Sequence, residues 1–162
     1  MVAMDTPLHI AARLGNTHIV KEILSRKPEY ARNLNQDGYT PLHLASLLGH
    51  LEVVKELIHG VMDVCVLKDK YGRTPLYYAT MMGRLEVMEE LLDIYPEYIM
   101  EMNAARETSL NIAVLCNQYE AYKLLLERFL QANKVEFIDY KGSEGNTVLH
   151  LHLPTSRKQF QD

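Results

Sequence analysis

The stretch Thr6-Pro7-Leu8-His9-Ile10-Ala11 recurs along the chain at a shift of 34 residues, and this recurrence decides the fold. The further copies read Thr40-Pro41-Leu42-His43-Leu44-Ala45, Thr74-Pro75-Leu76-Tyr77-Tyr78-Ala79 and Thr108-Ser109-Leu110-Asn111-Ile112-Ala113, and a shorter one, Thr147-Val148-Leu149-His150-Leu151, comes 39 residues later. A fixed period of this size indicates a stack of similar units, each of which buries its apolar face against its neighbours.

Each copy of the motif predicts the start of a short helix. The threonine hydroxyl caps the free amides of a first turn, and proline fits the next position because that position needs no N–H donor. The predicted helices run about nine residues and end at Gly15, Gly49, Gly83 and Asn117, which are the residue types that most readily adopt left-handed φ angles. The small residues at their centres let neighbouring helices approach closely; these are Ala11, Ala45, Ala79 and Ala113.

A second helix follows in each of the four long units, with apolar residues at spacings 0, 1, 4 and 5. The sets are Ile19, Val20, Ile23, Leu24; Val53, Val54, Leu57, Ile58; Val87, Met88, Leu91, Leu92; and Ala121, Tyr122, Leu125, Leu126. This spacing predicts one buried stripe on each helix. Between units, Asp37-Gly38 and Tyr71-Gly72 supply the positive-φ positions of a hairpin finger. The fourth unit has Arg106 where glycine is expected, so we expect a less regular finger there.

The composition is that of a folded domain. Among 162 residues, 48% are hydrophobic and 23% are charged, with a net charge of −4. These values exclude a disordered tail, a collagen-like rod and a disulfide-rich mini-protein. A nucleic-acid partner is not expected, because it requires a basic stripe. The apolar runs are too short to span a membrane and the N-terminus lacks a secretory signal, so we expect a cytoplasmic chain that does not insert into a membrane.

The repeated motif resembles the T-P-L-H-x-A signature of ankyrin repeats, whose period is about 33 residues. The resemblance implies an all-α fold, namely an ankyrin-repeat solenoid of stacked helix pairs with short β-hairpin fingers. In this interpretation residues 1–162 form a single domain. Its repeats span about 1–34, 35–68, 69–102 and 103–141, and an incomplete fifth spans 142–162.

Several segments are similar to those of plant ankyrin proteins with a C-terminal membrane domain headed by a Pro-Gly-Gly motif. They are Pro28-Glu29-Tyr30, Pro96-Glu97-Tyr98, Glu107-Thr108-Ser109-Leu110-Asn111-Ile112-Ala113-Val114, Asn117-Gln118-Tyr119-Glu120-Ala121 and Glu144-Gly145-Asn146-Thr147-Val148-Leu149-His150-Leu151. The resemblance implies the cytosolic part of a plant stress or defence signalling protein whose parent is attached to a membrane. His152 and Pro154 depart from the family pattern, and the sequence holds no Pro-Gly-Gly motif. We therefore assign no membrane function to this chain.

Histidines and cysteines are the candidates for chemistry, and we interpret them as structural. His9, His43 and His150 occupy the fourth position of the motif, where ankyrin histidines hydrogen-bond within and between units. The two histidines closest to the C-terminus lack the further ligands of a zinc site. Cys65 and Cys116 are expected to be buried or half-buried in a protein of a reducing compartment, without the oriented base of a catalytic thiolate. No phosphate-binding glycine motif occurs, so we expect no metal, no cofactor and no enzyme activity.

The remaining candidate is a protein-binding surface. The resemblance implies that the finger tips and the last turns of the first helices face a concave groove. Exposed apolar area with tyrosine, methionine and arginine is typical of interfaces. The groove positions hold Arg13, Leu14, Tyr39, Leu47, Leu48, Tyr71, Arg73, Met81, Met82 and Leu115. For Leu48 and Met82, packing between repeats is the alternative.

One apolar strip is expected within this set. Tyr39, Leu47, Tyr71 and Met81 occupy equal positions in two successive repeats, so stacking should place them side by side and outside the core. Such a strip suits an apolar helix or extended segment that carries an acidic residue. Replacing Tyr71 and Met81 together is expected to weaken partner binding by at least about 2 kcal/mol with little change in stability.

The predicted function is a non-catalytic protein–protein interaction module that binds a protein or peptide in the groove. One alternative is a free-standing soluble inhibitor of an enzyme such as a kinase, and sequencing the transcript beyond Asp162 distinguishes the two. An enzyme is the second alternative, which a deep polar pocket with paired titratable groups would favour. The fifth unit is expected to be the weak end of the stack, with fast amide exchange from about Ser143 onward, because Pro154 blocks extension of its helix.

Overall fold

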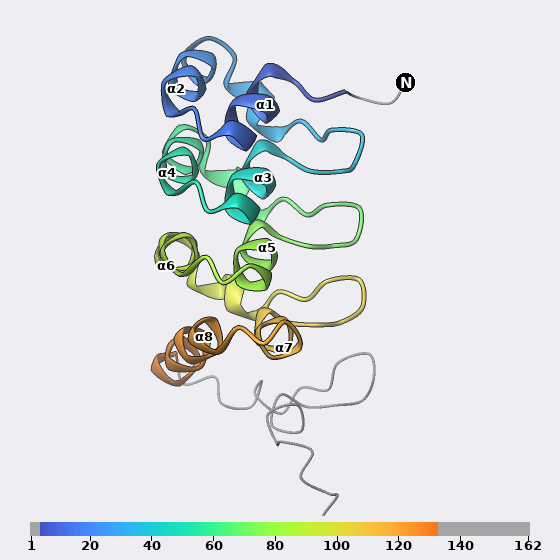
Figure 1. The fold of residues 1–162 in the computed structure, drawn as a ribbon, viewed down its shortest axis with the longest axis vertical. Helices are drawn as coiled ribbons and strands as arrows, with labels where there is room; N and C mark the ends of the chain where they lie inside the picture. The colour runs from blue at the N-terminus through green and yellow to red at the C-terminus, as the bar shows by residue number, and fades with distance from the viewer. Residues whose placement is uncertain (1–3, 133–162) are drawn as a thin grey trace, which may run out of the picture.

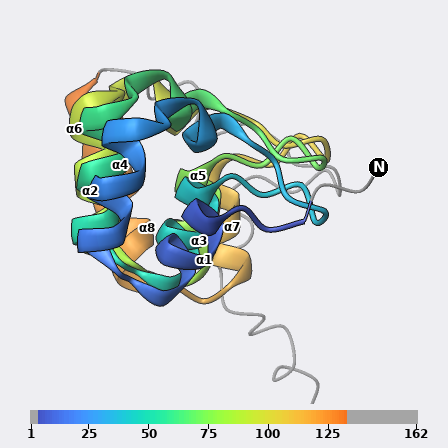
Figure 2. The same ribbon diagram turned by 90° about the horizontal axis from the view of Figure 1, so that it is seen from above.

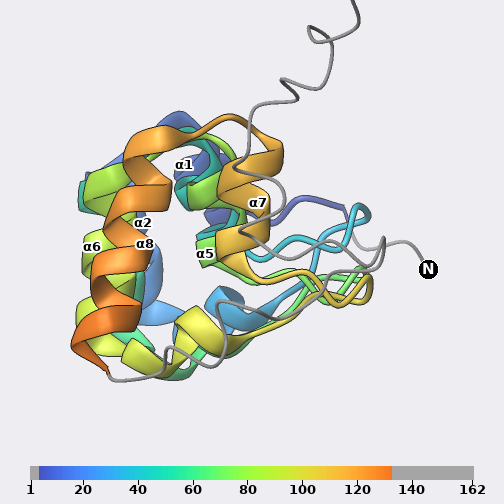
Figure 3. The same ribbon diagram turned by 90° about the horizontal axis from the view of Figure 1, so that it is seen from below.

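The computed structural model describes residues 4–132, which form helix pairs stacked one above another (Figure 1). The first helices of the pairs are α1 (Pro7–Leu14), α3 (Pro41–Leu48), α5 (Pro75–Met81) and α7 (Ser109–Leu115). The second helices are α2 (Thr17–Arg26), α4 (Leu51–Gly60), α6 (Leu85–Ile94) and α8 (Tyr119–Gln131). Figure 1 shows two columns of helices, and Figures 2 and 3, which look along the stack, show a set of loops, the fingers, projecting beside the first helices. The predicted stack of helix pairs is confirmed for the described residues.

Capping residues set the ends of the first helices. The threonines at the N-caps accept a hydrogen bond from the amide three residues further on; they are Thr6, Thr40, Thr74 and Thr108. Gly15, Gly49 and Gly83 follow the helices with φ angles of 70°, 77° and 65°, and Asn117 has a φ of 55°. The predicted helix starts and stops are therefore confirmed, including the asparagine that replaces glycine.

Three short 3-10 helices, which the sequence did not lead us to expect, connect the second helices to the fingers. They are η1 (Pro28–Arg32), η2 (Met62–Val66) and η3 (Pro96–Met100). Proline begins η1 and η3, where its missing amide costs nothing. The segments also contribute to the core, since Ala31, Val64, Cys65, Tyr98 and Ile99 are buried.

The fingers are loops closed by side chains rather than two-stranded hairpins. Within residues 4–132 the only isolated bridge pairs Met102 with Thr108, and no strand is present. At the base of each finger, one side-chain oxygen accepts the amides two and four residues further on; the three acceptors are Asn35, Asp69 and Asn103. The expected β-hairpins are thus corrected to Asx-type turns.

The finger that contains Arg106 is as regular as the other two, so the expectation of a less regular loop is wrong. Arg106 has a φ of 62°, close to the 71° of Gly72 at the same position. The amide of Asn103 donates to the carbonyl of Glu107 at 3.1 Å, and the amide of Arg106 donates to the carbonyl of Asn103 at 3.0 Å. These bonds hold a left-handed arginine that costs roughly 1–2 kcal/mol in isolation.

The main core lies between the two columns of helices. The predicted stripes of α4 and α6 are at most 1% exposed; they comprise Val53, Val54, Leu57, Ile58, Val87, Met88, Leu91 and Leu92. The stripe of α2 is more open, because Ile19 is 44% exposed. The central alanines of the first helices are at most 3% exposed, as close helix approach predicts; they are Ala11, Ala45, Ala79 and Ala113.

A ladder of side chains joins successive first helices. His50, Arg84 and Gln118 each donate a hydrogen bond to a carbonyl in the last turn of the preceding first helix, at 3.0, 3.2 and 3.0 Å. The carbonyls belong to Arg13, Leu47 and Met81. A Cβ atom on Gly15, Gly49 or Gly83 would collide with these donors. The glycines therefore serve both the left-handed turn and the contact between repeats.

The predicted fifth unit, with His150 and the exchange expected from about Ser143, lies outside the described residues. The repeat boundaries stay a prediction. Over residues 4–132, every helix is either too short or too polar to traverse a bilayer.

Candidate functional site

The predicted binding residues lie on the fingers and at the C-terminal ends of the first helices. Figure 2 shows the fingers projecting beside the first helices. We call this region the inner face. The fingers carry Tyr39, Tyr71 and Arg73, and the helix ends carry Arg13, Leu14, Leu47, Leu48, Met81, Met82 and Leu115. Some of these residues pack against other side chains, and others are exposed to solvent.

A second apolar cluster, separate from the main core, lies on the inner face. We call it the inner-face cluster; its buried members are Tyr77, Tyr78 and Ile112, and Tyr39, Leu47 and Met81 pack against them. The ring centroids of Tyr39 and Tyr78 lie 5.4 Å apart at an interplanar angle of 84°, and those of Tyr77 and Tyr78 lie 5.4 Å apart at 74°. Edge-to-face pairs of this kind add to the stability of apolar burial. The cluster thus brings together residues from three successive helix pairs.

The expected strip of four residues is only partly formed. Tyr39, Leu47 and Met81 meet in the inner-face cluster, whereas Tyr71 lies apart from it on a finger and is 47% exposed. Met81 is half-buried, so the expectation that its loss leaves stability nearly unchanged is corrected. A change at Met81 alters packing as well as any contact with a partner.

The finger of residues 69–73 presents an aromatic and cationic group. The guanidinium carbon of Arg73 lies 4.8 Å from the ring centroid of Tyr71 and 5.0 Å from that of Tyr77. The Lys70 ammonium lies 5.1 Å from the Tyr71 centroid. Distances below about 6 Å permit a cation–π attraction. Tyr77 belongs to the inner-face cluster, so Arg73 connects the exposed finger to that cluster.

Asp69 fixes the shape of this finger. One of its oxygens accepts the amides of Tyr71 and Arg73 at 2.8 and 2.9 Å, and the other accepts the hydroxyl of Tyr78 at 2.5 Å. Burial is the main cause that raises the pKa of Tyr78 above its ordinary value. The hydroxyl therefore keeps its proton at neutral pH and remains a donor to Asp69.

Exposed apolar side chains mark the ends of the first helices. We call the group of Leu14, Leu48, Met82 and Leu115 the end ladder; these residues are 72%, 38%, 44% and 52% exposed. Packing between repeats, the alternative for Leu48 and Met82, thus leaves more than a third of each side chain in water. Each helix pair contributes one member, so the end ladder runs along the stack.

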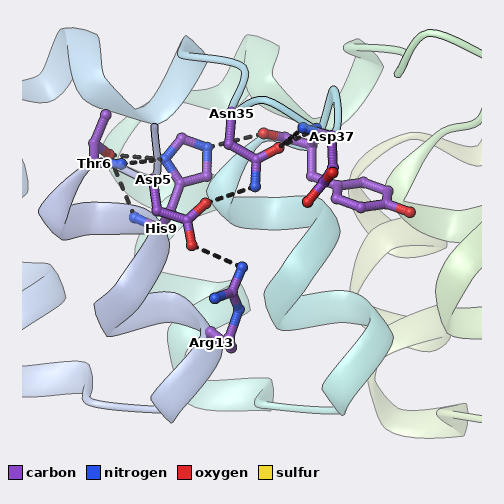
Figure 4. A network of polar contacts seen from close by, with 7 residues as sticks. Asp5, Thr6, His9, Arg13, Asn35 and Asp37 are labelled. Atoms are coloured by element: carbon purple, nitrogen blue, oxygen red, sulfur yellow. Dashed lines mark hydrogen bonds and ion pairs between the residues drawn. The ribbon is translucent and has the colours of Figure 1, made fainter. Parts of the chain in front are cut away.

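Arg13 is engaged within the chain (Figure 4). Its guanidinium forms a 2.8 Å ion pair with Asp5, whose other oxygen accepts a 2.7 Å hydrogen bond from the side-chain amide of Asn35. The network ties the end of α1 to the next finger. Arg13 therefore differs from Arg73, which has no ion pair among residues 4–132.

The motif histidines hydrogen-bond within and between repeats, as predicted. Nδ1 of His9 accepts the amide of Thr6 at 3.1 Å, and Nε2 donates to the carbonyl of Tyr39 at 2.8 Å (Figure 4). His43 does the same with Thr40 at 3.1 Å and Arg73 at 3.0 Å. Burial lowers the pKa of His9 and brings that of His43 to about 4. Both imidazoles are therefore neutral structural links at pH 7.

Burial suppresses ionisation of both cysteines. Burial raises the pKa of Cys65 to about 12 and also raises that of Cys116, so the thiolate needed by a nucleophile is disfavoured. Cys116 is exposed, which corrects the expectation that both are buried or half-buried. In the part of the chain that the structure describes, no three side chains of the metal-binding types gather into a site.

Sequence reasoning missed the buried half of the inner face. Tyr77 and Tyr78 replace the histidine and the following residue of the motif in the third unit, and this departure was an available signal for an aromatic cluster. Asp69 was also missed, although an asparagine or aspartate recurs there with the period of the repeat. The sequence pattern does not show the side-chain contacts between units that bring these residues together.

Two overlapping stretches, residues 3–66 and 62–136, match the family model described as ankyrin repeats in three copies. Together they cover well over half of the chain. Comparison with curated proteins finds no match.

Proposed function

The chain belongs to the ankyrin-repeat family, and from that premise we propose that it is a non-catalytic module that binds a protein partner through the inner face. Ankyrin repeats imply protein–protein interaction and are typically non-catalytic. The more specific part of this proposal is that the partner binds the inner face. The observation that carries it is the end ladder, which keeps four large apolar side chains at 38–72% exposure along the stack.

Exposure of this kind has a free-energy cost that a partner removes. Burying apolar surface yields about 25 cal/mol per Å², and contiguous exposed apolar area on a folded protein marks contact sites. The end ladder adjoins the inner-face cluster, because Met81 and Met82 are neighbours in the chain. A partner that covers both would therefore bury leucine, methionine and tyrosine side chains together.

Substitution of the end ladder tests the choice of surface. A partner is first identified by affinity capture with the 162-residue chain and then titrated against Leu48→Gln/Met82→Gln. We expect the double variant to bind at least about tenfold more weakly, because interface energy concentrates in central apolar anchors. Met62→Gln/Val66→Gln is the matched control, since these side chains on η2 are 59% and 46% exposed.

Both variants should melt close to the wild type, because the four replaced side chains are exposed. Wild-type affinity of a folded Leu48→Gln/Met82→Gln variant would remove the inner face from consideration. Loss of binding in the control instead would move the interface to the side that carries η2.

We also propose that the chain is the cytosolic ankyrin part of a plant stress or defence signalling protein attached to a membrane. The support is the set of segments similar to that group, of which Glu144-Gly145-Asn146-Thr147-Val148-Leu149-His150-Leu151 is the most specific. Free Cys65 and Cys116 suit a reducing compartment. Sequencing the native transcript beyond Asp162 tests the proposal. A continuation into membrane helices is expected, and a stop codon there would favour the free-standing inhibitor.

A further inference from the structure

We propose that Arg73, held between the rings of Tyr71 and Tyr77, binds the side-chain carboxylate of an aspartate or glutamate in the partner protein. The inference rests on the proposed function and names the chemistry that the inner face selects. Three observations support it. The guanidinium is fixed by packing, it forms only one long hydrogen bond in the described part of the chain, and no other described finger has an arginine at the same position.

The guanidinium is held in place before any partner arrives. Its carbon lies 4.8 Å from the Tyr71 centroid and 5.0 Å from the Tyr77 centroid. The Arg73 amide is fixed by Asp69 at 2.9 Å, and the carbonyl of Arg73 accepts a 3.0 Å hydrogen bond from His43. Both the backbone and the side chain are therefore ordered by packing, which lowers the entropy cost of binding.

The same guanidinium has only one, distant hydrogen-bond acceptor within the described part of the chain. Its only hydrogen bond there runs from Nη1 to the hydroxyl of Tyr78 at 3.5 Å, the long limit of such bonds. Its Nε is shielded from solvent without a partner. Arg73 keeps part of its surface exposed, so an anion can approach the fork of Nη atoms.

The carboxylates nearby are already engaged. Asp69 accepts three hydrogen bonds, from the amides of Tyr71 and Arg73 and from the hydroxyl of Tyr78. Glu107 lines a small hollow together with Arg73 and Tyr77, and it accepts a hydrogen bond from the side-chain amide of Asn103 at 2.8 Å. Neither forms an ion pair with Arg73. Within residues 4–132 neither of these carboxylates is left to pair with Arg73, and we infer that the partner supplies the acceptor.

The other described fingers lack this group. Residues 36–39 read Gln-Asp-Gly-Tyr, residues 70–73 read Lys-Tyr-Gly-Arg, and residues 104–107 read Ala-Ala-Arg-Glu. The position of Arg73 is thus taken by a tyrosine in one finger and a glutamate in the other. Lys70, which forms no ion pair with a described residue, adds a second positive charge 5.1 Å from Tyr71. Residues 69–73 therefore carry two positive charges, on Lys70 and Arg73, against the one negative charge of Asp69.

A carboxylate fits this site better than a phosphate. Arginine pairs with a carboxylate through two parallel N–H···O bonds. A phosphate carries nearly twice the charge and is usually held by a cluster of arginines, whereas Asp69 and Glu107 add negative potential here. Because Tyr77 also belongs to the inner-face cluster, the partner's acidic residue should be flanked by apolar side chains.

Selected peptides provide the test. A library of unphosphorylated random peptides, each about 16 residues long, is selected on the full 162-residue chain, and peptides are kept when Leu48→Gln/Met82→Gln abolishes their binding. We expect one Asp→Asn or Glu→Gln change in such a peptide to weaken its binding to the wild-type chain at least about tenfold. The same change should weaken its binding to the Arg73→Gln variant less than about twofold. Arg26→Gln is the matched control because Arg26 lies on α2 and pairs with Glu22.

A second readout does not depend on the stability of Arg73→Gln. The Nε–Hε resonance of Arg73 in the wild-type chain should shift with the acidic peptide and not with its amide counterpart. Inner-face peptides that show no such charge dependence would overturn the carboxylate site and leave the proposed function standing. Failure to select any inner-face peptide would overturn both. Tighter Arg73-dependent binding of a phosphoserine counterpart would overturn the carboxylate in favour of phosphate.

Discussion

At the scale of single residues, His43 shows how one side chain serves local and long-range structure. Its Nδ1 accepts the Thr40 amide at the start of α3, while its Nε2 reaches the Arg73 carbonyl in the next finger at 3.0 Å. Both bonds need the neutral imidazole with its proton on Nε2. The fourth unit has Asn111 at this position, which keeps the local bond to Thr108 at 2.9 Å. Within residues 4–132 its amide nitrogen has no partner.

Burial of His43 predicts a loss of stability on mild acidification. Its pKa is about 4 in the folded chain and 6.5 at its ordinary value. Between these pH values the unfolded chain binds a proton that the folded chain does not, so the free energy of unfolding falls as pH falls. At about 1.4 kcal/mol per unit of pKa the loss approaches roughly 3 kcal/mol. Urea unfolding measured from pH 7.5 to pH 4.5 checks it.

The variant His43→Asn, which copies the residue found naturally at Asn111, should flatten this pH dependence while costing about 1–3 kcal/mol at pH 7.5. Part of the slope should persist because burial also lowers the pKa of His9. His18→Asn changes an exposed histidine on α2 and serves as the control. An unchanged slope in His43→Asn would show that another group titrates.

Gly83 is predicted to be intolerant of a side chain. It has a φ of 65°, and an added Cβ would overlap the Gln118 side chain that donates to the Met81 carbonyl at 3.0 Å. Gly83→Ala should cost about 1–3 kcal/mol, combining left-handed strain with a weakened hydrogen bond. In a Gln118→Ala background the cost should shrink to the strain alone. Equal costs in both backgrounds, measured by urea unfolding, would rule out the contact.

At the scale of secondary-structure elements, the helices were predictable and the contacts between repeats were not. A threonine followed by proline and a glycine at the far end define three of the four first helices locally, so the sequence pattern alone locates Pro41–Leu48. The donors of the ladder are His50, Arg84 and Gln118, three different residue types at one repeat position. No residue pattern marks them, because what they share is reach to a carbonyl of the preceding helix.

The inner face was predictable in outline, because residues at equal positions of the repeat lie on one surface. Counting along the repeat placed Tyr39, Leu47 and Met81 on one surface, and they do meet in one cluster. Counting could not show that Met81 would be half-buried against Tyr77 and Tyr78. Nor could it separate Arg13, which pairs with Asp5, from Arg73, which has no such pair among the described residues. Those differences depend on which residue happens to face each position from the neighbouring unit.

The second helices are expected to contribute stability in proportion to their buried stripes. Leu57 on α4 is 0% exposed, so Leu57→Ala should cost about 2–5 kcal/mol. Ile19→Ala on α2 is the comparison, because Ile19 is 44% exposed, and it should cost less than about 1.5 kcal/mol. The free energies of unfolding in urea decide the matter. Similar values for the two variants would mean that the main core does not lie between the columns.

The caps of the first helices should have a smaller effect. Thr40 is 0% exposed and its hydroxyl accepts the His43 amide at 3.4 Å. Thr40→Ala should therefore cost about 1 kcal/mol, and Thr40→Ser, which keeps the hydroxyl, should cost less. If serine and alanine destabilised the chain equally, the lost methyl contact rather than the cap would explain the effect. Thermal unfolding of the two variants distinguishes these cases.

At the scale of the whole molecule, each helix pair depends on its neighbours. Hydrogen bonds from His9 and His43 cross from one repeat to the next finger, and those from His50, Arg84 and Gln118 cross back to the preceding helix. These two sets of hydrogen bonds run in opposite directions along the stack. A helix pair with a buried stripe and both sets of hydrogen bonds should therefore open rarely. A pair with a more exposed stripe should open at lower free energy.

Hydrogen exchange on the 162-residue chain should reveal this gradient. The helix α2 fully buries only Val20, whereas α6 buries Val87, Met88, Leu91 and Leu92. Both helices have 10 residues, so differences in length do not enter the comparison. Amides of α2 should exchange at least about tenfold faster than those of α6 after correction for intrinsic rates, since less apolar surface is exposed when α2 opens. The variant Leu91→Ala should bring the protection of α6 toward that of α2. Equal protection of the two helices in the unmodified chain would mean that the stack opens only as one cooperative unit.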